Sequence, residues 1–162
     1  MIVDDADAPG LLALSWSLTV KRGKHYAHAL TKTKKRVYMH RLIMGHPTGK
    51  LVDHINGETI SELDSNSVAR VVALNNRRSN LRICTRSENM GNSKPHSDRS
   101  GKYKGVYLEK STGKYVAQIC VNKVRTKIGR YATAIEAARA YDTMALLEFG
   151  EFALVNFKNE LA

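Results

Sequence analysis

The stretch Leu81-Arg-Ile-Cys-Thr-Arg-Ser-Glu-Asn89 decides the fold of the first half of the chain. Its beginning, Leu81 to Cys84, predicts a short strand. Thr85-Arg-Ser-Glu88 then matches a capping box, in which the hydroxyl and the carboxylate each accept a backbone N–H of the first turn. A helix should therefore begin at Thr85, with Asn89 in its first turn.

A second strand is predicted upstream, from Leu51 to His54. It ends in Ile55-Asn-Gly57, and Asn-Gly is a strong turn signal. A strand, a loop, a strand and a helix in this order should bring Asp53, His54 and Asn89 within reach of one another.

Phosphodiester cleavage needs a carboxylate, an imidazole and carboxamides, and the chain offers them at Asp53, His54, Asn80 and Asn89. The oxygens of Asp53 and Asn89 suit a hard cation such as Mg²⁺, or Mn²⁺ in its place. A histidine titrates near neutral pH, so His54 can take a proton from water. Asp53-His54 alone would also fit a strand-end pair with ordinary hydrogen bonds, but Asn80 and Asn89 favour catalysis.

The charge of the chain predicts a polyanionic partner. Lys and Arg number 26 against 15 Asp and Glu, which gives a formal charge of +11 in 162 residues. No acid occurs from Lys21 to Arg41, and only Glu109 occurs from Arg99 to Arg130. Such segregation fits nucleic acid, although the run from Lys32 to Arg36 also fits a solvated face.

The remaining composition predicts a cytoplasmic protein with no membrane partner. Cys84 and Cys120 form no CxxC pair, so neither a zinc ribbon nor a disulfide framework is supported. The N-terminus opens with acids, and the apolar run near Leu11 to Leu14 is short, so we expect neither a signal peptide nor a membrane span.

The chain should divide at the polar stretch from Gly91 to Gly101, which contains Pro95 and reads as a linker. Beyond it, strands are predicted over 103–109, 115–121 and 125–131, and a helix over 134–149 with Thr133 as its cap. Alternation in the middle strand turns Tyr115, Ala117, Ile119 and Val121 towards the helix. The other face carries polar and basic side chains: Tyr107, Lys114, Gln118, Arg125 and Lys127.

Two resemblances add to these inferences. Val52-Asp-His-Ile-Asn-Gly57 together with Asn75-Asn-Arg-Arg-Ser-Asn-Leu-Arg-Ile-Cys-Thr-Arg-Ser-Glu-Asn89 resembles the HNH homing endonucleases of phages and their group I introns. Gly101-Lys-Tyr-Lys-Gly-Val106, Gly113-Lys-Tyr-Val-Ala-Gln-Ile119 and Ala137-Ala-Arg-Ala-Tyr-Asp142 resemble the AP2/ERF DNA-binding domain. These imply an α+β chain: a ββα-metal nuclease domain over 1–93, a linker over 94–100, and over 101–162 a three-stranded antiparallel sheet packed on one helix.

The resemblance also implies roles for single residues. Asp53 and Asn89 match the metal ligands of the family, His54 its general base, and Asn80 the residue that holds the active-site loop and orients the histidine. Two features differ from the families: the loop from His54 to Asn80 is longer, as if residues 60–73 were inserted, and Cys120 stands where plant AP2 domains have a basic side chain. The insert predicts either an extra helix or a cover over the substrate groove, and His40 either joins the site or is packed.

We therefore expect a metal-dependent, site-preferring DNA endonuclease, of the homing type, in a bacterial host or phage-infected cell. It should act on double-stranded DNA and leave 5′-phosphate and 3′-hydroxyl ends. A monomer is favoured and should nick one strand, whereas a double-strand cut would need a dimer or a second encounter. A non-catalytic DNA-binding regulator and a nuclease for structured RNA are the alternatives. The predicted DNA contacts come from both halves of the chain: Arg41, Arg77, Arg78, Arg82, Lys102, Lys104, Tyr107, Lys114, Gln118, Arg125 and Lys127.

Overall fold

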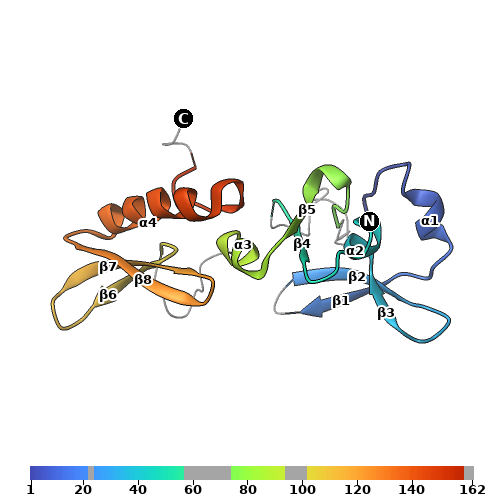
Figure 1. The fold of residues 1–162 in the computed structure, drawn as a ribbon, viewed down its shortest axis with the longest axis horizontal. Coiled ribbons are helices and arrows are strands. Elements are labelled where there is room, and N and C mark those ends of the chain that lie inside the picture. Colours follow the sequence, from blue (N-terminus) through green and yellow to red (C-terminus); the bar gives the residue numbers. More distant parts are fainter. Residues whose placement is uncertain (22–23, 57–73, 94–101, 159–162) are drawn as a thin grey trace, which may run out of the picture. The chain divides into compact units, whose positions relative to one another are not determined.

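The computed structural model of the chain describes residues 1–21, 24–56, 74–93 and 102–158, and these form two compact units (Figure 1). The first unit spans Met1–Cys84 and the second spans Thr85–Ala162. Each is described by itself below. The predicted linker at 94–100 and the predicted insert at 60–73 lie outside the described residues.

The first unit contains a three-stranded antiparallel sheet in the order β1-β2-β3. Its elements follow one another along the chain: α1 (Ala8–Leu12), β1 (Ser17–Lys21), β2 (Lys24–Leu30), β3 (Arg36–Tyr38) and α2 (Met39–Ile43). Strand β3 runs directly into α2. The apolar core lies between the sheet, α1 and α2: Leu11, Ala27, Met39, Ile43, Leu74 and Leu81, with Trp16 partly buried against them.

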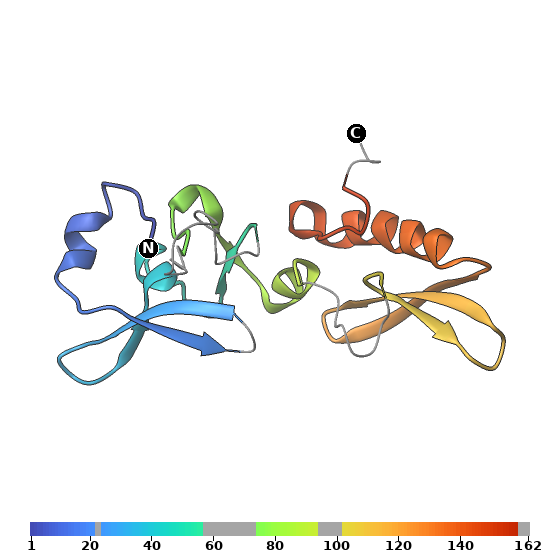
Figure 2. The same cartoon turned by 180° about the vertical axis from the view of Figure 1, so that it is seen from behind.

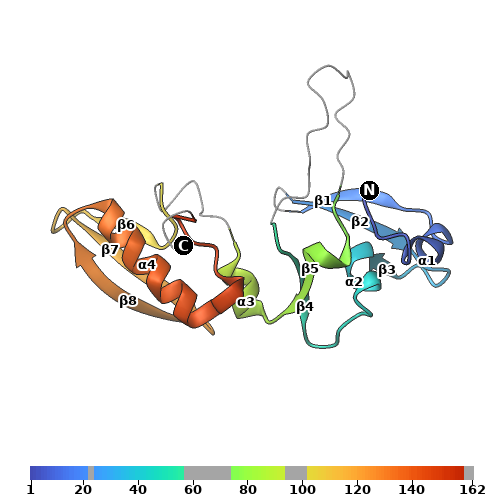
Figure 3. The same ribbon diagram turned by 90° about the horizontal axis from the view of Figure 1, so that it is seen from above.

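A second, two-stranded sheet in this unit pairs β4 (Leu51–His54) with β5 (Leu81–Cys84), both as predicted (Figure 3). The short 3-10 helix η1 (Arg78–Asn80) leads directly into β5. The N-terminus supports the residues before η1, because the backbone of Ile2 exchanges hydrogen bonds with Leu74 and Asn76, both of 2.8 Å. The first residues of the chain therefore hold in place the segment that leads into η1 and β5.

The second unit contains β6 (Val106–Glu109), β7 (Lys114–Val121) and β8 (Val124–Tyr131) in one antiparallel sheet. The helix α4 (Ala134–Phe149) begins at a Thr133 capping box and lies across one face of this sheet (Figure 2). The short helix η2 (Gly150–Phe152) follows it. As predicted, the alternate β7 residues face α4 and pack with its small side chains: Tyr115, Ala117, Ile119 and Val121 against Ala137, Ala138 and Ala145.

The strand predicted over 103–109 begins only at Val106. Gly105 precedes it with a φ of +75°, a conformation that interrupts a strand and favours glycine. A Cβ at this position would lie 2.0 Å from the Tyr141 ring, so Gly105 also lets the backbone approach α4. Local geometry therefore shortens the strand.

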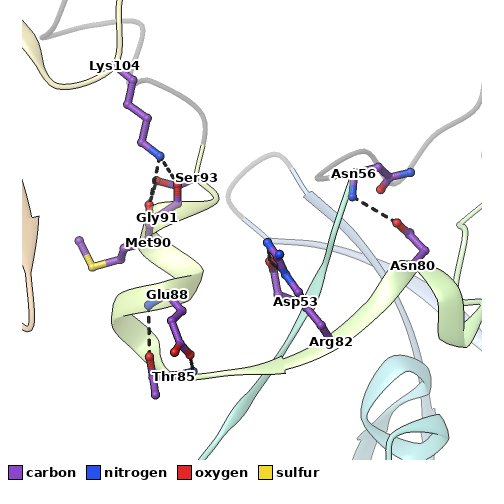
Figure 4. A network of polar contacts seen from close by, with 10 residues as sticks. All are labelled: Asp53, Asn56, Asn80, Arg82, Thr85, Glu88, Met90, Gly91, Ser93 and Lys104. Carbon is purple, nitrogen blue, oxygen red and sulfur yellow. Dashed lines mark hydrogen bonds and ion pairs between the residues drawn. The ribbon is translucent and has the colours of Figure 1, made fainter. Parts of the chain in front are cut away.

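Helix α3 (Arg86–Gly91) begins at Thr85, and its capping box is confirmed. The Thr85 hydroxyl accepts the Glu88 N–H at 3.2 Å, and the Glu88 carboxylate accepts the Thr85 N–H at 2.6 Å (Figure 4). The two units divide just before this helix, which packs on the rest of the second unit. The Asn122 N–H donates to the Ser87 hydroxyl at 2.9 Å, and the Gly91 carbonyl accepts the Leu154 N–H at 2.9 Å.

The mixed α and β composition and the antiparallel sheets are as predicted, whereas the ββα-metal arrangement remains a prediction. β4, β5 and α3 follow one another in the required order, but α3 belongs to the second unit. In the part of the chain that the structure describes, no helix is both long and apolar enough to cross a membrane.

Candidate active site and nucleic-acid interface

The pairing of β4 with β5 positions two of the predicted site residues. Asp53 lies opposite Arg82, and His54 lies opposite Leu81. Both predicted residues are buried, with exposed fractions of 6% for Asp53 and 8% for His54. The predicted carboxylate and imidazole therefore stand at the end of a short hairpin, largely shielded from water.

The imidazole of His54 is held by an asparagine that the sequence analysis does not single out. His54 Nε2 lies 3.0 Å from Asn76 Oδ1, and Asn76 is 2% exposed. The Asn76 amide nitrogen faces the Met39 sulfur at 3.5 Å, an arrangement that leaves the oxygen for the histidine. His54 Nε2 is then the N–H donor, and in the neutral ring the lone pair lies on Nδ1.

Asn80 ties together the two segments that flank this contact. Its side-chain oxygen accepts the Asn56 N–H at 3.2 Å, and its side-chain nitrogen donates to the Asn75 carbonyl at 2.9 Å (Figure 4). Asn56 lies two residues after His54, and Asn75 directly precedes Asn76. The Asn80 amide therefore joins the backbone after His54 to the backbone before Asn76. It can in this way support the position of Asn76, the residue bonded to His54.

His40 lies beside the site as a packed, neutral ring. It is buried, and its ring lies 5.3 Å from the His54 ring in an edge-on arrangement. The rings of Tyr26 and Tyr38 lie 5.7 Å and 5.8 Å away. Burial, followed by the nearby His54 and Arg41, lowers the pKa of His40 to about 3. His40 is therefore uncharged at neutral pH, and its ring packs against the ring of His54.

The carboxylate of Asp53 forms a buried ion pair with Arg82. The Arg82 Nη2 lies 3.2 Å from Asp53 Oδ2, and both side chains are largely buried (Figure 4). Arg82 is one of the predicted DNA contacts. In the structure its guanidinium balances the negative charge of Asp53, and a contact with DNA remains a prediction.

A magnesium site remains a prediction, and the side chains near Asp53 bear on which type of metal site would fit. No group of three or more His, Cys, Asp or Glu side chains that could hold a metal occurs within residues 1–21, 24–56, 74–93 and 102–158. Such a group suits zinc, whereas Mg²⁺ needs only one or two carboxylates together with water and phosphate oxygens. A buried carboxylate at Asp53 beside an imidazole fits that second type.

Asp53 and His54 lie on β4 and Asn80 lies in η1, so all three belong to the first unit. The remaining predicted metal ligand, Asn89, lies in α3 of the second unit, half-buried, with its N–H bonded to the Thr85 carbonyl at 3.1 Å. Its partnership with Asp53 therefore remains a prediction.

The other arginines predicted to contact DNA in the first unit have different surroundings. Arg41 donates to the carbonyls of Pro47 and Lys50 at 2.8 Å and 3.1 Å, so it closes the loop before β4. Arg78 forms a two-pronged ion pair with Asp7, at 2.6 Å and 2.9 Å. The side chain of Arg77 is exposed. Phosphate contacts by these residues remain predictions.

The open face of the second sheet carries the polar side chains that the alternation predicts. Cross-strand pairs place Lys114 beside Glu109, Tyr107 beside Val116, Gln118 beside Lys127, and Cys120 beside Arg125. α4 covers the opposite face, so this basic face has no helix of the second unit packed on it in the part of the chain that is described (Figure 2). It is the best candidate in the molecule for a nucleic-acid interface.

Two lysines before this sheet differ. Lys102 is exposed, with its ammonium 5.5 Å from the centre of the Tyr103 ring. Lys104 is buried, and its ammonium donates to the carbonyls of Gly91 and Met90 (Figure 4). Burial lowers the pKa of Lys104 to about 8, and the nearby Asp142 opposes that shift. A DNA contact by Lys104 remains a prediction; in the structure its ammonium is buried and bonded to carbonyls at the end of α3.

Comparison with known proteins bears on both halves of the chain. Residues 101–147 match the model of the AP2 domain family. Over 138 residues the chain is 31% identical to a protein of Acanthamoeba polyphaga mimivirus named as an uncharacterized HNH endonuclease. That match covers 84% of this chain and 64% of the relative, so the chain spans less than two thirds of the relative's length.

Proposed function

We propose that this chain, whose sequence supports an HNH plus AP2 architecture, is a metal-dependent endonuclease that nicks double-stranded DNA. One observation carries the proposal: a buried imidazole, His54, is bonded to Asn76, and the preceding residue of β4 is the buried Asp53. The similarity to a protein named as an HNH endonuclease supports nuclease chemistry, and the AP2 domain supports DNA as the substrate.

His54 acts as the general base. With Nε2 held by Asn76, the lone pair of the neutral ring lies on Nδ1, which takes a proton from a water molecule. The resulting hydroxide attacks phosphorus, and the bond from phosphorus to the 3′ oxygen breaks. The 3′ oxygen is protonated by solvent, so the products are a 5′-phosphate and a 3′-hydroxyl.

Asn80 and Asn76 are positioning residues. Asn80 joins the backbone after His54 to the backbone before Asn76, and Asn76 fixes the tautomer and the orientation of the ring. A histidine side chain that is already oriented loses little further conformational entropy when the substrate binds. The two asparagines therefore act at different levels: Asn76 contacts the histidine, and Asn80 holds the backbone around it.

Asp53 would hold the divalent metal, Mg²⁺ or Mn²⁺, with Asn89 as the second protein ligand that the sequence predicts. When bound, such a metal stabilises negative charge on the phosphoryl oxygens and on the departing oxygen. Arg82 supplies positive charge to Asp53 at a distance of 3.2 Å, so it competes with the metal for that carboxylate.

The AP2 unit supplies affinity for duplex DNA. Its open face carries Lys114, Arg125 and Lys127, and contacts of such side chains with phosphates provide most of the binding energy and fix the register. Contacts with base edges add a limited sequence preference. A monomer has one such nuclease site and therefore cuts one strand.

Plasmid relaxation tests the proposal. With Mg²⁺, the wild-type chain should convert supercoiled plasmid to open circles with 5′-phosphate ends, and chelation of the metal should stop the reaction. His54→Ala should bind the plasmid without cutting it. His46→Asn is the matched control, because His46 is exposed, has a φ of +50° that asparagine tolerates, and should not affect cleavage.

Two outcomes would replace the proposal. A wild-type protein that binds duplex DNA tightly and never cuts it would be a DNA-binding regulator. A protein that cuts an RNA duplex faster than the matched DNA duplex would be a ribonuclease. The deep and narrow major groove of A-form RNA does not admit a three-stranded sheet, which is why DNA is preferred here.

A further inference from the structure

The first seven residues of the chain contact the segment that leads into η1. The backbone of Ile2 donates to the Leu74 carbonyl and accepts the Asn76 N–H, both at 2.8 Å. Ile2 thus lies beside Asn75 in a parallel bridge. The N-terminus therefore holds the backbone of Asn76, the residue whose side chain is bonded to His54.

Asp4 holds the next part of this segment. The first N–H of a helical turn has no carbonyl partner within the turn. In η1 this is the Arg78 N–H, and the Asp4 carboxylate accepts it at 2.8 Å from 74 positions earlier in the chain. A hydrogen bond to a charged acceptor is stronger than one between neutral groups. A carboxylate from the start of the chain therefore holds the turn that ends at Asn80.

Asp7 adds a second contact to the same residue. Its carboxylate accepts Arg78 Nη2 at 2.6 Å and Arg78 Nε at 2.9 Å. The Asp7 N–H donates to the Asp4 carbonyl at 3.0 Å, and this turn brings both acids to Arg78. Val3 packs against the apolar core of the unit, so the segment that carries the two acids is itself anchored.

The histidine and its partner need such support because they are far apart along the chain. Asn76 follows His54 by 22 positions, and closing a loop of that length costs conformational entropy. Asn80 supplies one compensating contact, through its bonds to the Asn56 N–H and the Asn75 carbonyl (Figure 4). The N-terminal segment supplies the others.

We propose that Asp4 is a positioning residue of the nuclease site and that Asp7 supports it through Arg78. The proposal rests on the proposed function, because it assigns the two acids to the site in which His54 is the general base. Asp4 acts through η1 and Asn76, and it touches neither the DNA nor the metal. The Arg78 guanidinium serves as the anchor for the N-terminal segment.

A contribution to stability alone explains less. The Arg78 side chain is 57% exposed, and exposed ion pairs add little to the free energy of folding. The bonds from Ile2 and Asp4 reach Leu74, Asn76 and Arg78, which are alternate positions of one short segment. Contacts spaced in this way restrict the backbone that presents the partner of the histidine.

The test is a double-mutant cycle on the single-turnover cleavage rate of the full chain, with Mg²⁺ and saturating duplex DNA. Asp4→Ala should cut about tenfold more slowly than the wild type and bind DNA with unchanged affinity. In an Asn76→Ala background the same change should cost less than about twofold, because the residue through which Asp4 acts has already been removed. Equal losses in the two backgrounds would show a merely structural role and overturn the proposal.

Two further variants of the acids sharpen this result. Asp4→Asn retains an oxygen that can accept the Arg78 N–H, so it should keep most of the wild-type rate. Asp7→Asn weakens the ion pair, keeps the volume of the side chain, and should slow cleavage about threefold. It takes the place of Asp4→Ala in the cycle if Asp4→Ala does not fold. A wild-type rate for Asp7→Asn would contradict the supporting role of Asp7.

A second readout does not depend on cleavage. The proton on His54 Nε2 should exchange slowly with water in the wild type, because it is bonded to the buried Asn76. NMR should show faster exchange of this proton in Asp4→Ala. Asp5→Ala is the matched control, since it removes the same charge from the adjacent, exposed residue, and it should change neither the exchange nor the cleavage rate.

The outcomes separate this proposal from the proposed function. If the wild type cuts duplex DNA and Asp4→Ala cuts equally fast, the positioning role fails while the proposed function stands. If Asp5→Ala is as slow as Asp4→Ala, the effect comes from the charge of the N-terminus, and the positioning role fails again. If the wild type does not cut duplex DNA, the proposed function fails, and proton exchange alone decides whether Asp4 positions His54.

Discussion

His54 Nε2 lies 3.0 Å from the side-chain oxygen of Asn76, a residue 22 positions further along the chain. This contact orients the ring and places the lone pair on Nδ1. Asn76→Ala should therefore lower the turnover rate about tenfold to a hundredfold, as loss of a supporting hydrogen bond to an active-site ligand usually does. KM for the DNA should change little, because Asn76 is 2% exposed and a buried side chain offers little surface to the DNA.

Single-turnover and steady-state cleavage rates would separate the effect on the turnover rate from the effect on KM. Ser79→Ala, an exposed change in the neighbouring η1 turn, is the control and should behave as the wild type does. An Asn76→Ala chain that folds and cuts at the wild-type rate would show that His54 needs no such support.

The ion pair between Asp53 and Arg82 predicts a link between stability and metal. Arg82→Met leaves a buried carboxylate without its guanidinium, so the free energy of unfolding should fall by about 3–5 kcal/mol in the absence of metal. Millimolar Mg²⁺ should restore more stability to Arg82→Met than it adds to the wild type, because the cation replaces the lost charge. Denaturant unfolding with and without Mg²⁺ measures both. Equal gains in the two proteins would argue against a metal at Asp53.

The close approach of α3 to α4 predicts that Gly91 cannot be enlarged. A Cβ at Gly91 would lie 2.7 Å from Cγ of Phe149, so Gly91→Ala should destabilise the folded chain by about 1–3 kcal/mol. Gly10→Ala is the control, since nothing lies within 4 Å of a Cβ at that position. Thermal unfolding compares the two. A Gly91→Ala protein as stable as Gly10→Ala would mean that α3 is not held on the second unit.

The ion pair between Glu109 and Arg130 on the second sheet has a signature in the titration of its acid. Hydrogen bonds from Arg130 and then Thr112 lower the pKa of Glu109 from 4.5 to about 2. The pair therefore stabilises the folded chain fully above pH 4.5, and this contribution is lost as the pH falls through about 2. NMR titration of the Glu109 carboxyl carbon should give the low value in the wild type and a higher value in Arg130→Met, which still falls short of 4.5 because Thr112 and Lys127 continue to lower the pKa. Identical midpoints would exclude the pair in solution.

The sequence predicts the elements with local signals and misses the contacts that join distant residues. The helix from Ala134 to Phe149, the Thr85 cap and both strands of the β4–β5 hairpin are confirmed, because capping boxes and apolar alternation are local. The predicted strands 115–121 and 125–131 are also present, and the turn between them has a positive φ at Asn122 and Lys123. These signals act within a few residues and can be read from a short window.

The missed features depend on tertiary packing. Asn76 is one of two adjacent asparagines, and only the fold shows which of them meets His54. Lys104 belongs to the basic segment from Arg99 to Arg130, but its ammonium is bonded to the end of α3. The pair of Glu109 and Arg130 lies on non-adjacent strands, so its partners become neighbours only when the sheet forms.

The most direct test of the central claim is the single-turnover cleavage rate of His54→Ala on saturating duplex DNA with Mg²⁺, with DNA binding measured in parallel. The account predicts unchanged binding and a rate lower by about 10²- to 10⁴-fold, the usual loss when a general base is removed. Cleavage by His54→Ala at a rate close to that of the wild type would contradict it.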